Sequence, residues 1–76
     1  MPTIRPLSYE KVVRIFEAAG CSYSHTKGDH MIFNFRGARR PVVIPKYREV
    51  PVFIIKNNMN VIGLSRDRYL ELEARV

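Results

Sequence analysis

The chain contains a single cysteine, Cys21, among its 76 residues. Because a lone thiol cannot form an internal disulfide, a fold of this size must be stabilised by packing or by a partner. Long apolar runs are also missing: the longest, residues 50–55, includes Pro51, whereas a membrane-spanning helix needs about 20 apolar residues. The N-terminus has no apolar segment of the kind found in a secretory signal. These absences predict a cytoplasmic protein that does not cross a membrane.

Clustered glycines and paired carboxylates are absent as well. The four glycines are widely spaced, which excludes a phosphate-cradling loop or a dinucleotide fingerprint, so we expect no cofactor. The spacing of Cys21, His25, Asp29 and His30 matches no closed zinc pattern, and we predict no metal. Asp29 is the only carboxylate near these histidines, which leaves no pair for glycosidase-type acid and base catalysis.

Length and composition predict one domain that covers residues 1–76. Apolar residues make up 46% of the chain and charged residues 26%, which argues against disorder and against a repeat array. A chain this short buries only about 60% of the surface that its unfolded form exposes. Its core must therefore be thin.

Positive charge is concentrated in the middle of the chain. The sequence has 13 Lys and Arg against 7 Asp and Glu, a net charge of +6. Residues 27–56 contribute +5 of this, because seven cations there face only Asp29 and Glu49. Such a segment favours a polyanion, since each neutralised phosphate releases condensed counterions; a solvated basic surface is the alternative. The cations that we expect to contact RNA are Lys27, Arg36, Arg39, Arg40, Lys46 and Arg48.

The apolar pattern predicts a helix followed by three strands. Ser8 is a suitable N-cap, apolar residues then recur with the helical period, and Gly20 suits the position after the last turn. This predicts a helix over about residues 9–19. Beyond it the period changes to two, as in β-strands. The predicted strands cover about residues 21–26, 30–35 and 42–44.

Two further helices are predicted after the strands. Pro51 suits the first turn of a helix that ends near Asn60, and Ser65 is a suitable cap for a short third helix. The order helix, three strands, helix, helix predicts an α+β fold. We expect a two-layer sandwich, in which helices cover one face of a three-stranded antiparallel sheet and the other face is open.

His30 is the first candidate for catalysis. It begins the second predicted strand after a Gly-Asp turn, and alternation directs it away from Met31 and Phe33, onto the open face. Imidazole can accept or donate a proton near neutral pH, which suits attack by a ribose 2′-hydroxyl on the neighbouring phosphate. Lys27 and Arg36, at the two ends of the strand, are candidates to stabilise phosphate charge. A solvated surface histidine is the alternative.

His25 and the aromatic residues have simpler interpretations. Alternation groups His25 with Cys21 and Tyr23, which predicts a packed strand histidine rather than a catalytic partner. Aromatic residues on a sheet can stack on nucleotide bases, but so small a domain needs them for packing. We therefore assign to the core Met31, Phe33, Phe35 and Phe53.

Four stretches of the sequence resemble the HicA (YcfA-like) toxins. They are residues 17–21, 27–33, 42–45 and 64–70. The most specific is the turn from Gly28 to His30 that leads into an aromatic strand, and the similarity extends from about Ser8 to Leu72. The resemblance implies a fold like the double-stranded-RNA-binding domain and ribonuclease activity on messenger RNA. It also implies that His30 is the catalytic residue and that a HicB-like antitoxin inhibits the protein.

The sequence departs from the pattern of that family at three places. Asp29 stands where members often have Ser, and its carboxylate attracts an imidazolium but repels a nearby phosphate. A frequent His after the third strand is replaced by Lys46-Tyr47, and a Gly-Thr pair at the second helix by Val52-Phe53. These changes weaken the case for RNA contact at the second helix, where Phe53 and Ile54 are candidates to meet a protein partner.

These observations lead to one hypothesis and two alternatives. The hypothesis is the toxin component of a toxin-antitoxin system, a metal-independent endoribonuclease that cleaves mRNA with His30 as general acid or base. The first alternative is an RNA-binding module that holds structured RNA through its basic hairpin without cutting it. The second is an interaction partner whose basic face binds an acidic protein.

Overall fold

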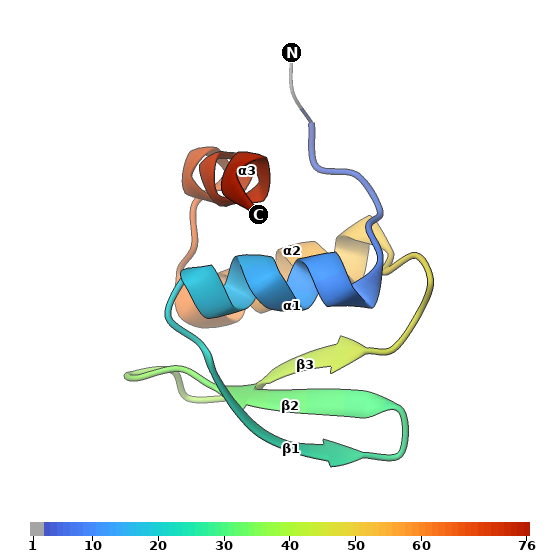
Figure 1. The fold of residues 1–76 in the computed structure, drawn as a ribbon. Coiled ribbons are helices and arrows are strands. Elements are labelled where there is room, and N and C mark those ends of the chain that lie inside the picture. The colour runs from blue at the N-terminus through green and yellow to red at the C-terminus, as the bar shows by residue number, and fades with distance from the viewer. Residues whose placement is uncertain (1–2) are drawn as a thin grey trace.

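The computed structural model describes residues 3–76. Its elements, in chain order, are α1 (Tyr9–Ala18), β1 (Ser22–Lys27), β2 (His30–Asn34), β3 (Val42–Pro45), α2 (Val52–Ile62) and α3 (Arg66–Arg75). This is the predicted order of an α+β fold, and the elements begin and end within about two residues of their predicted bounds (Figure 1). The prediction of the fold class is confirmed.

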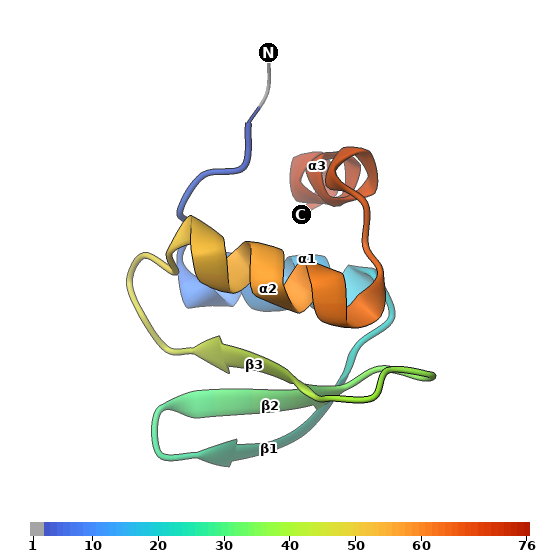
Figure 2. The same ribbon diagram turned by 180° about the vertical axis from the view of Figure 1, so that it is seen from behind.

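The three strands form one antiparallel sheet in the order β1-β2-β3. α1 and α2 lie across one face of this sheet, and the opposite face has no helix of residues 3–76 over it (Figures 1 and 2). Phe33 of β2 and Ile44 of β3 are fully buried on the helix side. His30 and Asn34, which alternate with Phe33 along β2, are exposed. The predicted faces of Phe33 and His30 are therefore confirmed.

Local sequence signals set the ends of the two helices on the sheet. Ser8 is the N-cap of α1, and its Oγ accepts a hydrogen bond from the backbone N–H of Lys11 at 3.4 Å. The buried residues of α1 belong to the same core cluster as Phe33. α2 ends at Gly63, whose φ of 69° is a left-handed conformation that glycine adopts without strain.

α3 lies on the far side of the helix layer, away from the sheet (Figure 1). Its Tyr69 is fully buried and packs near Phe16 of α1, with a ring-centroid distance of 6.4 Å. No helix of residues 3–76 is long and apolar enough to cross a membrane. Because α3 packs behind α1, the open face of the sheet remains uncovered.

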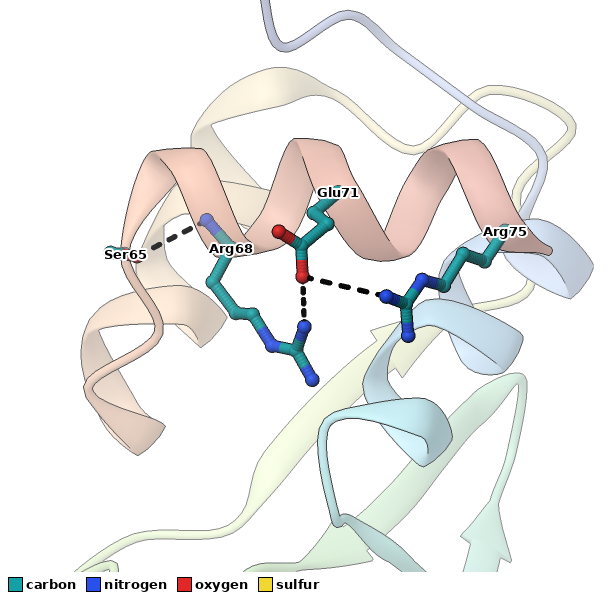
Figure 3. Close-up of polar contacts among 4 residues, drawn as sticks. All are labelled: Ser65, Arg68, Glu71 and Arg75. Carbon is teal, nitrogen blue, oxygen red and sulfur yellow. Dashed lines mark hydrogen bonds and ion pairs between the residues drawn. The ribbon is translucent and has the colours of Figure 1, made fainter.

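The charged side chains of α3 interact mainly with one another. Ser65 caps the helix, and its Oγ accepts a hydrogen bond from the backbone N–H of Arg68 at 3.2 Å. The carboxylate of Glu71 contacts both Arg68 and Arg75 (Figure 3). The positive charge of this helix is therefore partly neutralised within the helix itself.

A buried amide joins the sheet to α2. The side-chain Nδ2 of Asn58 donates a hydrogen bond to the carbonyl oxygen of Val43 at 2.9 Å, and its Oδ1 accepts one from the Val43 N–H at 3.3 Å. These two backbone groups lie on the edge of β3 that has no neighbouring strand. Asn58 therefore satisfies the backbone of an edge strand, a role that the sequence analysis did not identify.

β1 contains an irregularity that overturns one prediction. Tyr23 is opposite Phe33, but His25 is opposite Ile32, so one extra residue, Ser24, is inserted in β1. Such a β-bulge shifts the alternation of side chains by one residue. His25 consequently shares a face with Ile32, and like every residue of β1 it is exposed. The prediction of a packed histidine grouped with Tyr23 is wrong.

Candidate nucleic-acid interface

His30 is positioned by the turn that precedes it. Gly28 has a φ of 63°, which allows the tight connection between β1 and β2. The Oδ1 atom of Asp29 lies 3.0 Å from Nδ1 of His30. The carbonyl oxygen of Asp29 also accepts a hydrogen bond from the N–H of Lys46 at 2.8 Å, which ties the turn to the end of β3. The imidazole is 46% exposed, so a bound molecule can reach it.

The contact with Asp29 determines which nitrogen of His30 can accept a proton. An ionised carboxylate can only accept a hydrogen bond, so this contact favours the tautomer of the ring that carries its hydrogen on Nδ1. In the neutral ring the lone pair is then on Nε2, and no group among residues 3–76 bonds to that atom. A carboxylate that holds the Nδ1 hydrogen in this way prepares the ring to act as a general base.

Two of the predicted RNA-contacting cations lie beside His30. Lys27 is opposite His30 in the register of β1 and β2, and cross-strand partners project from the same face with Cβ atoms about 5 Å apart. Lys46 directly follows Pro45, which is opposite His30 in β3. We call the set of Lys27, Asp29, His30 and Lys46 the histidine corner.

Three other predicted cations lie at the opposite end of the sheet. The loop between β2 and β3 carries Arg36, Arg39 and Arg40, and we call it the arginine loop. β2 alone extends about 13 Å from His30 to Asn34, and the arginine loop begins beyond that point (Figure 1). Arg36 is therefore placed to meet a different phosphate from the one at His30. Arg48, the sixth predicted cation, lies between β3 and α2.

The six cations are not engaged by carboxylates of the protein. Within residues 3–76, no ion pair involves Lys27, Arg36, Arg39, Arg40, Lys46 or Arg48. In α3, by contrast, Arg68 and Arg75 both contact Glu71. The cations of the sheet can therefore bind phosphate without first losing an internal partner, as expected for a surface that binds RNA.

A groove separates the arginine loop from α2. Its volume is about 500 Å³, and Arg40 is the only charged residue of the described chain that lines it. Phe53, at the start of α2, also lines it and is 73% exposed. The assignment of Phe53 to the core is therefore wrong, because its position at the first turn of α2 faces away from the buried cluster. Ile54, the other apolar residue noted at this place, is half-buried in the same groove.

A larger hollow of about 760 Å³ lies between the N-terminal segment and α3. Its lining carries the carboxylates of Asp67, Glu71 and Glu73 against the cations Arg5 and Lys11, so the charged side chains that line it have a net negative charge. These negative charges repel phosphate, and α3 lies on the side of the helices away from the sheet. We therefore do not assign this hollow to the RNA-binding surface.

Cys21 does not contribute a nucleophile to this surface. Burial raises the pKa of its thiol to about 11 from a usual value of 9. The thiol therefore stays protonated at neutral pH, and the protonated form is a poor nucleophile. No group of three or more His, Cys, Asp or Glu side chains in the described part of the chain is arranged to hold a metal ion.

The bulge in β1 brings a second imidazole to the open face. His25 is opposite Ile32, and Ile32 lies on the same face of β2 as His30. Sequence reasoning placed His25 on the wrong face because no glycine or other signal in residues 22–27 marks the inserted position. A strict alternation was the simplest interpretation of that segment.

Comparison with models of known protein families gives a match. The family model described as the HicA toxin of bacterial toxin-antitoxin matches residues 9–64. The matched region covers more than half of the chain, from the start of α1 to the residue after Gly63, and contains the whole histidine corner. It leaves out α3. A comparison with curated proteins found no match.

Proposed function

The chain belongs to the HicA toxin family of bacterial toxin-antitoxin systems, whose toxins are generally ribonucleases, and from this we propose that it is a metal-independent endoribonuclease acting on messenger RNA. The observation that best supports the proposal is the setting of His30. Its Nδ1 contacts Asp29, its Nε2 makes no bond within residues 3–76, and the unpaired Lys27 lies opposite it.

The proposed reaction uses the RNA itself as the nucleophile. A ribose 2′-oxygen attacks the adjacent phosphorus, so that the O2′–P bond forms, the P–O5′ bond breaks and the leaving 5′-oxygen takes up a proton to become a hydroxyl. Nε2 of His30 takes the proton from the 2′-hydroxyl as general base. Lys27 stabilises the additional negative charge on the phosphate oxygens. This route needs neither a protein nucleophile nor a metal ion, because the attacking oxygen is already held next to phosphorus.

The remaining cations would hold the RNA strand on the open face. Lys46 continues the positive surface beyond His30, and Arg48 lies in the loop that follows β3. The arginine loop would bind phosphates further along, since it begins more than about 13 Å from His30. In this proposal His30 is the catalytic residue. The residues that contact RNA are Lys27, Arg36, Arg39, Arg40, Lys46 and Arg48.

The first experiment compares the wild type with His30→Ala on messenger RNA in excess EDTA, with products separated on a denaturing gel. Loss of a general base lowers cleavage by about 10²- to 10⁴-fold, and RNA binding stays nearly unchanged. Asn34→Ala is the matched control, because Asn34 lies on the same face of β2 at its other end. Unchanged cleavage by His30→Ala would exclude the catalytic role, and cleavage that requires added Mg²⁺ would exclude the metal-independent mechanism.

An RNA-binding module that does not cut is the second candidate function. It is favoured by the arginine loop, which lies apart from His30 and could hold RNA without any chemistry (Figure 1). The same gel distinguishes the two functions. Intact RNA after incubation with folded wild-type protein that binds it would select the binding module.

A toxin of this family has an antitoxin partner, and the partner in this proposal is a HicB-like protein. The groove beside α2 suits a segment of that antitoxin that is both apolar and acidic. Phe53 offers the apolar contact, and Arg40 is the only charge in the lining, so a carboxylate there would find an opposite charge. Apolar residues that are exposed beside a groove are typical of protein interfaces.

This contact can be tested with a HicB-like antitoxin from the same genome. Phe53→Ser should weaken its binding by about 10-fold or more, because a buried aromatic anchor is lost, and should leave RNA cleavage by the free toxin unchanged. Tyr47→Ser is the control, since Tyr47 is also exposed but does not line the groove. Equal antitoxin affinity for Phe53→Ser and wild type would exclude this contact.

A further inference from the structure

We propose that His25 is a second catalytic residue, which donates a proton to the leaving oxygen while His30 accepts one from the attacking hydroxyl. This inference rests on the proposed ribonuclease function. Metal-free cleavage of RNA requires two proton transfers, one from the 2′-hydroxyl and one to the 5′-oxygen. A single imidazole cannot perform both at the same moment, so a concerted reaction needs a second group as proton donor.

The bulge at Ser24 places the two imidazoles on one face. Beyond it the register is regular, with His25 opposite Ile32 and Lys27 opposite His30. His25 and His30 are thus diagonal neighbours on the open face, and the Cα atoms of such neighbours are about 7–8 Å apart. This separation leaves room for one phosphodiester group between the two rings. Without the inserted Ser24, His25 would share the face of Tyr23.

Both rings are held through the same nitrogen. Nδ1 of His30 contacts Asp29, and Nδ1 of His25 lies 2.9 Å from Oγ of Ser24. Each ring therefore has its Nε2 atom left without a partner among residues 3–76. The partners differ in kind: the carboxylate only accepts, whereas the hydroxyl can either donate or accept. Asp29 thus favours a proton-accepting Nε2 on His30, while Ser24 also tolerates a protonated His25 that donates from Nε2.

The two histidines balance the reaction. As the O2′–P bond forms, the 2′-hydroxyl proton moves to Nε2 of His30. As the P–O5′ bond breaks, the proton on Nε2 of His25 moves to the leaving 5′-oxygen. The products are a 2′,3′-cyclic phosphate and a 5′-hydroxyl, and exchange with solvent returns each ring to its starting state. Lys27, which lies between His25 and the β1–β2 turn, meets the phosphate oxygens.

The charged groups around the two rings are few. Lys27 lies on the same strand as His25 and opposite His30, and Asp29 contacts His30 directly. From β3, the residue opposite His30 is the uncharged Pro45, and Lys46 follows it. Ile32, opposite His25, has no charge. Lys27 is thus the cation nearest to both rings in the register, which suits a phosphate bound between them.

The test uses two RNA substrates with the same mapped cleavage site. One has the natural 5′-oxygen, and in the other this bridging oxygen is replaced by sulfur, a leaving group that departs without a proton. His25→Ala should lower single-turnover cleavage of the natural RNA by about 10²-fold or more, as for loss of a general acid. Its rate on the sulfur-containing RNA should stay within a few-fold of wild type. His30→Ala should lower both rates.

Several outcomes separate this inference from the proposed function. If His25→Ala cleaves natural RNA as fast as wild type while His30→Ala does not, the ribonuclease stands and the role of His25 is excluded. Equal losses on both substrates would show that His25 binds or positions RNA and does not act as the acid. Wild-type protein that cuts neither substrate would overturn both proposals. Ser22→Ala, on the same strand, controls for changes to β1, and circular dichroism confirms that each variant is folded.

Discussion

The two ends of the open sheet both carry cations but are built differently. At the histidine corner, the Asp29 carbonyl accepts a hydrogen bond from Lys46, and the Val50 N–H donates one to Leu7 at 2.6 Å. The N-terminal segment, the β1–β2 turn and the chain after β3 thus support one another. In the arginine loop, the hydrogen bond from the Ala38 N–H to the Phe35 carbonyl at 3.0 Å is a local one.

The difference follows from what each end is proposed to do. Proton transfer requires donor and acceptor atoms within hydrogen-bond distance, so the turn that holds His30 must be fixed by long-range contacts. Neutralising phosphate requires only that a cation comes near, and long flexible side chains on an exposed loop satisfy that need. We therefore expect variants at the two ends to change different quantities, the rate of cleavage at one and the affinity for RNA at the other.

Among variants that leave both His30 and His25 in place, the largest effect on the rate of cleavage is expected for Asp29→Asn. An amide can donate to Nδ1 of His30, which moves the ring hydrogen to Nε2 and removes the lone pair that accepts the 2′-hydroxyl proton. Cleavage at saturating protein should fall by about 10-fold or more. This effect is smaller than the roughly 10⁴-fold fall in rate that follows the same substitution of a buried carboxylate bound to a catalytic histidine. RNA affinity should be equal or higher, because a negative charge near the phosphate is removed.

The control for this prediction is Glu49→Gln. It removes the other negative charge of residues 27–56, but Glu49 forms no ion pair with a histidine among residues 3–76. Single-turnover rates and fluorescence anisotropy separate chemistry from binding. A rate loss of the same size in both variants would mean that net charge, and not the orientation of His30, determines the rate.

At the other end of the sheet, Arg39→Ala with Arg40→Ala should weaken RNA binding at every sequence. Each cation lost lowers the salt dependence of binding by about one unit in the slope of log affinity against log salt. Cleavage at saturating protein should stay at the wild-type rate, since the arginine loop is far from His30. Arg68→Ala is the control, because Arg68 already contacts Glu71. An unchanged salt slope in the double variant would remove the arginine loop from the RNA-binding surface.

The comparison also shows what the sequence could and could not predict. The face of His30 followed from strict alternation along β2, and the Gly-Asp turn marked where that strand begins. His25 was misplaced because a bulge changes the face of every residue beyond it and needs no special residue type. Phe53 was assigned to the core from its size alone, although its position at the first turn of α2 leaves it exposed. Asn58 was missed because its partners are backbone groups of a strand far away in the chain.

Asn58→Ala should destabilise the fold and so lower both cleavage at the histidine corner and RNA binding at the arginine loop. It leaves the N–H and carbonyl of Val43 without partners, and an unsatisfied buried group costs about 1–3 kcal/mol of the free energy of unfolding. Because β3 joins the arginine loop to the histidine corner, cleavage and binding should decline with the same temperature dependence. Asn57→Ala is the control from the next position of α2. Urea denaturation measures the loss, and equal midpoints for the two variants would contradict the role of Asn58.

The smallest effect on stability, cleavage and RNA binding at neutral pH is expected for Tyr69→Phe. Tyr69 belongs to neither end of the sheet. The hydroxyl of Tyr69 is buried without a hydrogen-bond partner in the described residues, so its removal should leave the free energy of unfolding equal or slightly higher. Cleavage rate and salt slope should both match the wild type. A change in either would mean that α3 communicates with the open face, and the comparison of the two ends would then have to include it.

At alkaline pH, the stability of Tyr69→Phe should differ from that of the wild type. Burial, with a smaller contribution from Glu73, raises the pKa of Tyr69 to about 12 from a usual value of 10. Because the unfolded chain ionises first, the stability from Tyr69 is full below pH 10 and is lost as the pH rises through about 12. Wild-type protein should therefore lose about 1 kcal/mol more than Tyr69→Phe between pH 9 and pH 11 in urea denaturation. Parallel losses in the two proteins would show that the Tyr69 hydroxyl reaches solvent, because only a buried hydroxyl resists ionisation in the folded state.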